Sequence, residues 1–227
     1  MLMGLTSSAV GGATGLLWAP SASAKQPHND YFSRLNESLK RDGPGRPLMI
    51  LDIDAVNHNV DMIAASVGEN KNYRVVVKSL PSIYLLQHVM KRAKTNSLMV
   101  FHQPFLNELA EKMPESDVLL GKPLPVNAVR TFYAKLDRRS YDAANQIQWL
   151  IDSEDRLEQY MKLAKELGVS MKFNFEINVG LHRGGYDEPE QIASSLLKLR
   201  QSSAKSSVSG LMGYEPHLTG QRASLKD

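Results

Sequence analysis

The sequence predicts an α/β fold of the (β/α)8 barrel type. Strand-like and helix-like segments alternate along the chain from residue 47 onward, as they do in barrels and in doubly wound sheets. The strand-like segments are mostly continuous apolar runs, which is typical of parallel strands covered on both faces. A doubly wound sheet is the alternative, and the number of strands favours the barrel.

The strand-like runs are Leu48–Ile53, Arg74–Val77, Ser97–Phe101, Asp117–Leu120, Ile147–Ile151, Met171–Ile177 and Val208–Tyr214. The helix-like segments are Asp30–Arg41, ahead of the first run, and then Val56–Ser66, Ser82–Lys94, Pro104–Met113, Val126–Leu136, Ser153–Leu167 and Glu188–Arg200. Some helix boundaries have a local cause. Pro104 suits a first helical turn, Glu154 and Asp155 suit the positive end of a helix dipole, and Gly168 suits a helix end.

A closed barrel of this type needs an eighth strand, and the sequence ends at Asp227, soon after the seventh. We therefore expect a barrel that is truncated after its seventh strand. The expected organisation is a leader at residues 1–24, an N-terminal helix and linker at residues 25–46, and the incomplete barrel at residues 47–227.

Residues 1–24 contain no charged residue and end in Ala22-Ser23-Ala24, a pattern similar to a signal-peptidase site. The leader therefore predicts a periplasmic or secreted protein, cleaved after Ala24. It lacks the positively charged start of a signal peptide, so a disordered, low-complexity leader on a cytoplasmic protein is the alternative. Glycine and serine interrupt the apolar stretch, and no stable membrane span is expected.

The composition excludes several classes of function. The net charge is +3 with both signs interspersed, and the absence of a long basic block argues against a nucleic-acid partner. The sequence contains no cysteine, which excludes disulfides, thiolate metal ligands and a cysteine nucleophile. No His, Asp or Glu cluster has a convincing metal-ligand spacing, so no metal site is predicted.

Lys78 is the most informative residue of the sequence. Three valines precede it and the run Ser79–Pro81 follows, which predicts a buried strand that delivers one amine to the end of a sheet, just before a turn. The carboxyl ends of strands are where α/β barrels keep their chemistry, and a lysine desolvated there is a usable nucleophile for a Schiff base. An ordinary lysine that leaves a strand for solvent is the alternative.

Three further motifs also end predicted strands, at Leu51–Asn59, Phe173–Tyr186 and Gly210–His217. In order and spacing, these motifs and the Lys78 strand resemble the fold-type III pyridoxal-phosphate (PLP) enzymes, the alanine racemase-like superfamily. The resemblance covers about residues 47–217 and is closest to the D-threonine aldolase and D-serine dehydratase branch. The run Val179–Gly185 looks like the branch's D-x-G-x-x-R-x-G strand end, with Asn178 near the usual aspartate.

The resemblance implies a PLP-binding barrel in which Lys78 and Arg183 are the catalytic residues. Lys78 would hold the cofactor as a Schiff base and then move a proton at the substrate Cα. The cationic fork of Arg183 would lie beside the cofactor and the lysine. A surface arginine in a glycine-rich loop is the alternative for Arg183.

The other cofactor-binding residues that the resemblance and the strand ends suggest are Asp54, His102, Tyr214 and His217. Tyr214 would lie near the pyridine ring and His217 near the phosphate or the substrate. His102 would line the same mouth, and Asp54 would pair with Lys78. The alternatives are a core tyrosine, a histidine at a helix start without a special role, and an Asp54 that caps the following helix.

The expected function is that of a PLP-dependent lyase or amino-acid racemase. It would activate Cα of a D-amino acid or β-hydroxy amino acid for aldol cleavage, dehydration or racemisation. The sequence departs from the branch, since its lysine loop lacks a second histidine and lysine, and the main phosphate loop and the C-terminal β-domain with its metal ligands are absent. A divalent metal is therefore expected only in a full-length protein, and a homodimer is an implication of the resemblance. The alternatives are a non-catalytic PLP-binding homeostasis protein and an inactive barrel fragment.

Overall fold

The computed structural model describes residues 28–78, 82–202 and 205–218. The chain divides into two compact units, Met1–Ile50 and Leu51–Asp227. The predicted leader at residues 1–24 and the predicted turn at Ser79–Pro81 lie outside the described residues.

The first unit contains one described helix, α1 (Asp30–Asp42). It begins where the Asn29 side chain accepts a hydrogen bond from the Phe32 N–H at 3.1 Å, a typical N-cap. It ends at Gly43, whose N–H donates to the Leu39 carbonyl. Every α1 side chain is at least partly exposed, so capping rather than burial sets the limits of this helix.

The second unit is an α/β fold built on a parallel sheet. Its strands are β1 (Arg74–Val76), β2 (Ser97–Val100), β3 (Asp117–Leu120), β4 (Ile147–Ile151), β5 (Lys172–Glu176) and β6 (Ser207–Met212). Its helices are α2 (Ile53–Val67), α3 (Ile83–Ala93), α4 (Gln103–Lys112), α5 (Val126–Lys135), α6 (Ala143–Gln146), α7 (Glu154–Leu167), α8 (Pro189–Gln201) and a 3-10 turn, η2 (Pro216–Leu218).

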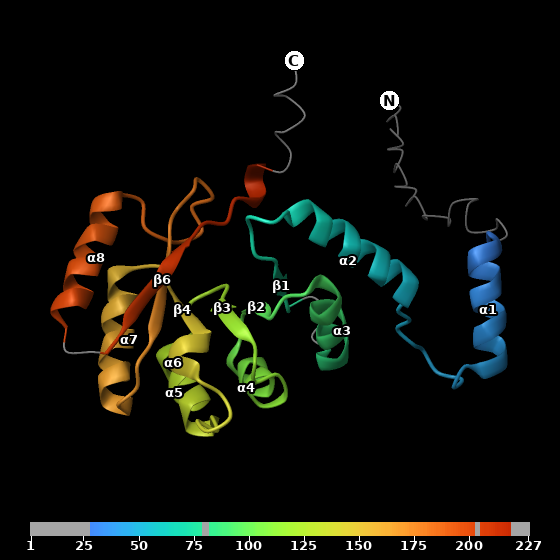
Figure 1. Ribbon diagram of the computed structural model, residues 1–227, viewed down its shortest axis with the longest axis horizontal. Coiled ribbons are helices and arrows are strands. Elements are labelled where there is room, and N and C mark those ends of the chain that lie inside the picture. Colours follow the sequence, from blue (N-terminus) through green and yellow to red (C-terminus); the bar gives the residue numbers. More distant parts are fainter. Residues whose placement is uncertain (1–27, 79–81, 203–204, 219–227) are drawn as a thin grey trace, which may run out of the picture. The chain divides into compact units, whose positions relative to one another are not determined.

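The six strands pair in sequence order, β1 to β6, and all neighbours are parallel. Figure 1 shows helices α3 to α8 ranged around the outside of this sheet. Right-handed connections between strands that are neighbours in both sequence and sheet place their helices on one face of the sheet, as in a barrel. In a doubly wound sheet the strand order reverses, which puts helices on both faces. The predicted barrel-type α/β fold is therefore confirmed over the doubly wound alternative.

The predicted opening strand, Leu48–Ile53, is wrong. In the structure these residues form no strand, and α2 already begins at Ile53, three residues before the predicted Val56. The cause is local: the Asp52 carboxylate accepts a hydrogen bond from the Ala55 N–H at 3.0 Å and caps the helix. The apolar side chains of the run stay exposed, with Met49 at 81%.

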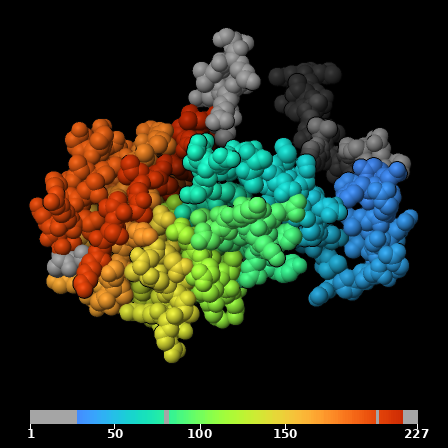
Figure 2. Space-filling view, viewed as in Figure 1, coloured from blue at the N-terminus to red at the C-terminus, as the bar shows by residue number. Residues whose placement is uncertain are grey.

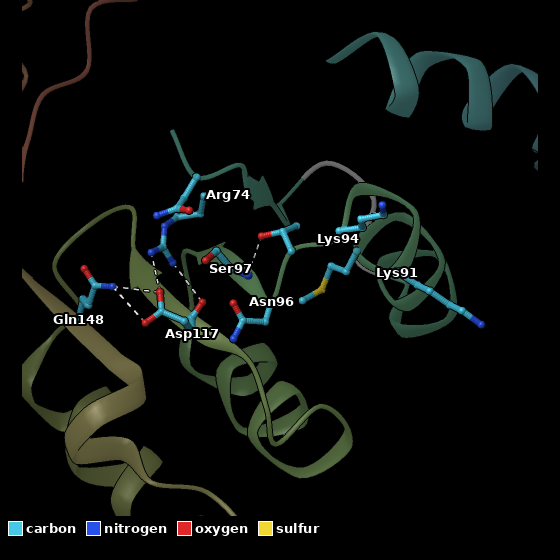
Figure 3. Close-up of a pocket in the computed structure, with 10 residues that line it drawn as sticks. Arg74, Lys91, Lys94, Asn96, Ser97, Asp117 and Gln148 are labelled. Carbon is cyan, nitrogen blue, oxygen red and sulfur yellow. Dashed lines mark hydrogen bonds and ion pairs between the residues drawn. The ribbon is translucent and has the colours of Figure 1, made fainter. Parts of the chain in front are cut away.

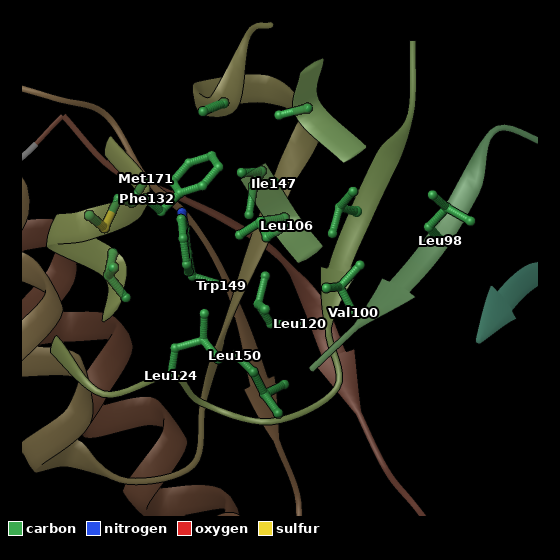
Figure 4. Packing of buried hydrophobic residues seen from close by; sticks show 14 of the residues in the cluster. Leu98, Val100, Leu106, Leu120, Leu124, Phe132, Ile147, Trp149, Leu150 and Met171 are labelled. Atoms are coloured by element: carbon green, nitrogen blue, oxygen red, sulfur yellow. The ribbon is translucent and has the colours of Figure 1, made fainter. Parts of the chain in front are cut away.

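The sheet has two different faces. On the outer face, side chains such as Val100, Leu120 and Trp149 are at most 1% exposed and pack against the helices (Figure 4). On the inner face, residues such as Arg74 and Gln148 alternate with them and stay partly exposed. The prediction of continuous apolar strands covered on both faces is therefore confirmed for the carboxyl ends of β3 to β5, where inner-face residues such as Leu119 and Leu150 are also buried. It is wrong for β1 and β2, where buried and more exposed residues alternate.

An aromatic cluster fills the centre of the outer core. The Trp149 ring lies edge-on to Phe132 and Tyr160, with ring centres 5.7 and 6.0 Å apart. Such pairs add about 0.5–1.5 kcal/mol each beyond the burial of their surface. The cluster joins β4 to α5 and α7, so it fixes the helices against the strands whose ends carry the polar residues described below.

Helices α2 and α3 pack side by side, as Figure 2 shows in cyan and green. Two polar contacts join them: His88 Nε2 lies 2.7 Å from Asn57 Oδ1, and Arg92 donates twice to the Asp61 carboxylate. None of the helices in residues 28–78, 82–202 and 205–218 is long and apolar enough to cross a membrane.

Candidate active site

The carboxyl ends of parallel strands lie at one edge of a sheet, and four charged side chains and one aromatic ring lie at this edge here. Lys78 follows β1, Phe101 follows β2, Lys122 follows β3, Asp152 follows β4 and Glu176 ends β5. Ligands of α/β proteins bind at this edge, since the loops that shape a site leave the strands there. This edge is therefore the candidate active site.

Lys78 emerges from β1 beside the end of β2. The Val77 N–H donates to the Met99 carbonyl at 3.1 Å, which continues the sheet one residue past β1 and leaves Lys78 as the first residue outside it. The Lys78 amine lies 4.7 Å from the centre of the Phe101 ring. Lys78 is exposed, contrary to the desolvated amine that was predicted.

Arg183 is held by two partners. Its Nη2 donates to Glu176 Oε1 at 2.8 Å, and its guanidinium carbon lies 4.4 Å from the centre of the Tyr214 ring. The Lys122 amine lies 4.0 Å from the same Glu176 oxygen. The Glu176 side chain is 3% exposed, and its other oxygen, Oε2, is buried without a hydrogen-bond partner in the described part of the chain. This packing favours a fixed arginine over a mobile surface one.

A tight connection after β5 brings Arg183 back to the strand that it left. The Tyr186 N–H donates to the Glu176 carbonyl, and the Asn178 N–H donates to the Tyr186 carbonyl, both at 2.8 Å. Gly185 has φ +98°, and a Cβ there would lie 2.8 Å from the Glu176 carbonyl oxygen. Only glycine suits this close approach, so the loop closes against the end of β5 and fixes the position of Arg183.

The Asn178 side chain organises the turn inside this loop. Its Oδ1 accepts hydrogen bonds from the Gly180 and His182 N–H groups, at 3.1 and 3.0 Å, and its amide donates to Asp187 at 2.6 Å. His182 adopts φ +54°, an unfavourable value for a residue other than glycine, and these bonds help to hold it. His217 Nε2 lies 3.3 Å from the place of a Cβ on Gly180, so predicted residue His217 packs on this turn.

The remaining predicted residues occupy other positions. Tyr214 stacks on Arg183 and is 44% exposed, so it is not a core tyrosine. Asp54 lies exposed in the first turn of α2, where Asp52 rather than Asp54 is the cap. Within the residues described, no ion pair joins Asp54 to Lys78, which argues against that predicted contact. His102 stands exposed at the N-cap position of α4, where its side chain makes no capping bond.

Sequence reasoning missed four residues of this edge: Phe101, Lys122, Asp152 and Glu176. One signal was available for the last of them. In the run Lys172–Glu176, Phe173 and Phe175 alternate with polar residues, so Glu176 falls on the face opposite the apolar core. A glutamate at the end of an otherwise buried strand needs a cationic partner, and Arg183 follows seven residues later.

A cavity of about 840 Å³ lies at the other end of the sheet, around the amino ends of β1 to β4 (Figure 3). Two of its charged groups, Arg74 and Asp117, already satisfy each other. Arg74 pairs with Asp117 at 2.5 Å and donates to the Leu98 carbonyl at 2.9 Å, and Gln148 donates to both Asp117 oxygens. This network ties four strands together, and we assign it a role in stability rather than in chemistry.

Comparison with known proteins identifies a family for most of the chain. The sequence model of the family described as alanine racemase, N-terminal domain, matches residues 51–225. Among curated proteins, none matches this sequence.

Several solved structures are similar in fold. A D-threonine aldolase from Filomicrobium marinum has a TM-score of 0.60 and 16% identity, over 73% of this chain and 43% of that one. An alanine racemase from Bacillus anthracis, with bound L-Ala-P, has a TM-score of 0.57 and 17% identity, over 74% and 42%. A histidine racemase from Leuconostoc mesenteroides subsp. sake has a TM-score of 0.55 and 10% identity, over 70% and 41%. The chain thus spans less than half the length of these proteins, and the likeness concerns the fold.

Proposed function

Because this chain belongs to the family of alanine racemase N-terminal domains, we propose that it forms the PLP-binding barrel of an enzyme that acts at Cα of an amino acid. The observation that carries the proposal is the gathering of Lys78 and the Arg183–Glu176 pair at the carboxyl edge of one sheet. The fold-type III resemblance of the motifs supports the same cofactor.

The residues present fit PLP. Lys78 offers a primary amine at a strand end, on the face of the sheet that helices do not cover. The same edge of the sheet carries three cationic side chains, those of Lys78, Lys122 and Arg183, and two carboxylates, those of Asp152 and Glu176. The edge therefore carries a net positive charge, which suits an anionic ligand such as a phosphate or a carboxylate.

Each residue would have its own task. PLP, when bound, supplies the conjugated ring that delocalises the electron pair left at Cα. The Lys78 amine would hold the cofactor through its aldehyde carbon and, once released from it, would take or return a proton at Cα. Arg183, fixed by Glu176 and Tyr214, would present its remaining N–H groups to the cofactor or to the substrate carboxylate.

The proposed substrate is a D-amino acid or a β-hydroxy amino acid, and the proposed reactions are aldol cleavage, dehydration or racemisation. The similarity in fold to proteins named alanine racemase and D-threonine aldolase supports this range. These reactions share the loss of a group from Cα, which leaves an electron pair for the cofactor ring to delocalise. The Lys78 amine would take the Cα proton in racemisation and dehydration, and would return a proton to Cα after aldol cleavage. Aldol cleavage needs in addition a base at the β-hydroxyl, and racemisation needs a proton donor on the opposite face.

Borohydride trapping tests the proposal. The full chain is incubated with PLP and reduced with borohydride, and the pyridoxyl adduct is located by peptide mass spectrometry. We expect one adduct per chain at Lys78, none in Lys78→Ala, and an adduct that is still at Lys78 in Lys122→Ala, which removes another lysine of the same edge. Labelling scattered over several lysines, and equal in Lys78→Ala, would show that Lys78 is not the cofactor lysine. Product analysis with D-alanine and D-threonine then separates racemase from lyase activity.

A further inference from the structure

We propose that Phe101 is a positioning residue for Lys78, and that Gly121 makes the room in which the Phe101 ring lies. The Lys78 amine lies 4.7 Å from the centre of the ring, within the distance of about 6 Å at which a cation is attracted to an aromatic face. The proposal rests on the proposed function in one respect, since it takes Lys78 to be the cofactor lysine.

The three residues come from three neighbouring strands. Lys78 follows β1, Phe101 follows β2 and Gly121 follows β3, and these strands are adjacent in the sheet. The Gly121 N–H donates to the Val100 carbonyl at 2.9 Å, which brings Gly121 alongside the residue that precedes Phe101. β2 is thus followed by Phe101, and its two neighbours β1 and β3 are followed by Lys78 and Gly121.

The Phe101 ring lies directly over Gly121. A Cβ on Gly121 would clash with two carbon atoms of the ring and would lie 3.0 Å from Met99 Cγ. Gly121 is buried beneath these side chains. Any larger residue at position 121 would therefore push the ring away from its present place, and with it the surface on which the Lys78 amine rests.

The position of Phe101 is not explained by the core. The buried core lies on the outer face, where Val100 is 1% exposed and Phe105 is 7% exposed. Phe101 alternates with Val100 and so faces the inner side, where it is only partly buried. A large aromatic side chain on this polar side contributes less to packing than one on the outer face, and its described contacts are with the active-site lysine and with Gly121.

The Phe101 ring would attract the positively charged nitrogen of Lys78 and hold it over the ring face. A free lysine side chain samples many rotamers, and an attractive surface at the end of β2 confines its amine to the inner face, where a cofactor would meet it. The same surface favours the nitrogen when it carries a positive charge in the covalent link to the cofactor. Loss of the ring should therefore weaken cofactor capture without changing the fold.

Three variants separate the parts of the proposal. Phe101→Leu removes the aromatic face, Gly121→Ala displaces an unchanged ring, and Phe101→Tyr keeps the face and should rescue the wild-type behaviour. Phe105→Leu is the matched control, because it makes the same substitution on the outer face. Phe101→Met, which keeps most of the bulk, replaces Phe101→Leu if that variant does not fold by circular dichroism.

Two readouts are compared in each variant. The first is the PLP concentration at which Lys78 is half labelled under borohydride. The second, which needs no cofactor, is trace acetylation with acetic anhydride, expressed as the rate at Lys78 relative to that at Lys122. We expect Phe101→Leu and Gly121→Ala to raise the half-labelling concentration about two- to fivefold. We also expect both variants to shift the Lys78-to-Lys122 acetylation ratio from its wild-type value, and in the same direction as each other. Phe101→Tyr and Phe105→Leu should match the wild type in both.

Wild-type values of both readouts in Phe101→Leu would overturn the proposal, even if Lys78 were the cofactor lysine. An equal effect of Phe105→Leu would also overturn it, because the effect would then come from general loss of packing. If PLP does not label wild-type Lys78, the proposed function fails instead. The acetylation ratio then decides alone whether Phe101 positions the amine.

Discussion

The ion pair between Glu176 and Arg183 should be more sensitive to loss of the arginine than to loss of the glutamate. The Glu176 side chain is 3% exposed, whereas that of Arg183 is 30% exposed. Arg183→Ala therefore leaves a buried carboxylate whose nearest cation, the Lys122 amine, is 4.0 Å away. Breaking a buried pair in this way costs about 3–5 kcal/mol of folding free energy. Glu176→Ala leaves a guanidinium that water can reach, so we expect about 2 kcal/mol, the value of a lost charge-assisted hydrogen bond.

A double-mutant cycle measures the pair itself. Urea unfolding, followed by far-UV circular dichroism, is compared for the wild type, the two single variants and the double variant. We expect a coupling energy of about 1.5–3 kcal/mol between the two positions, since the contact is a short hydrogen bond between charged groups. Lys122→Ala serves as the control for general loss of positive charge and should cost less than about 1 kcal/mol.

Two results would refute this reasoning. If Glu176→Ala destabilises the protein as much as Arg183→Ala does, the loss of stability in Arg183→Ala does not come from an unpaired buried carboxylate. If the coupling energy is near zero, the two side chains do not depend on each other. Arg183 would then be a surface arginine, and its proposed place beside the cofactor would lose its structural support.

Three further predictions concern the core and two local devices. Burial raises the pKa of Tyr133 to about 12, whereas an unfolded tyrosine ionises near pH 10, so the stability that Tyr133 contributes below pH 10 is lost as the pH rises toward 12. Tyr133→Phe should therefore lessen the alkaline loss of stability by up to about 1.4 kcal/mol per pH unit, and a wild-type slope in urea titrations between pH 9.5 and 11.5 would contradict this. Gly185→Ala should destabilise the fold by about 3 kcal/mol, because φ is +98° and the new Cβ meets the Glu176 carbonyl, whereas an unchanged urea midpoint would mean that the loop relaxes freely. Ser153→Ala should lower the free energy of unfolding by about 1 kcal/mol, because the hydroxyl accepts a hydrogen bond from the Arg156 N–H at the start of α7. Ser153→Asp should restore the wild-type stability, since aspartate also caps helices.

Most of the fold could be predicted because its signals are local. The strand pattern located β1 to β6 to within one or two residues, and the caps at Ser153 and Gly168 marked the ends of α7. The opening run Leu48–Ile53 failed for a reason of the same kind. Its apolar composition is that of a strand, but Asp52 caps a helix within it, and no neighbouring strand in the described residues pairs with it. A strand forms only where a neighbouring strand can pair with it, and the amino-acid composition of a run does not show whether such a strand is present.

The candidate site was predictable only in part. Lys78 and Arg183 each stand in a recognisable motif, so their places at the strand ends followed from sequence. The partner of Lys78 did not, because Phe101 meets Lys78 only through the pairing of β1 with β2. Glu176 lies seven residues before Arg183, and the alternation in its strand was the signal that could have found it. The exposure of Lys78 also depends on what covers the inner face, and no local pattern reports this.

Substitutions on the two faces of the sheet have different consequences, one for the stability of the fold and the other for the candidate active site. Substitutions at outer-face positions such as Trp149 act on the quantity of folded protein, since Trp→Ala in a core costs about 3–5 kcal/mol. Substitutions near Lys78 would change the candidate active site and leave the buried packing of the outer face intact. Such an arrangement lets new activities arise, or be engineered, by changing one rim of a scaffold that continues to fold.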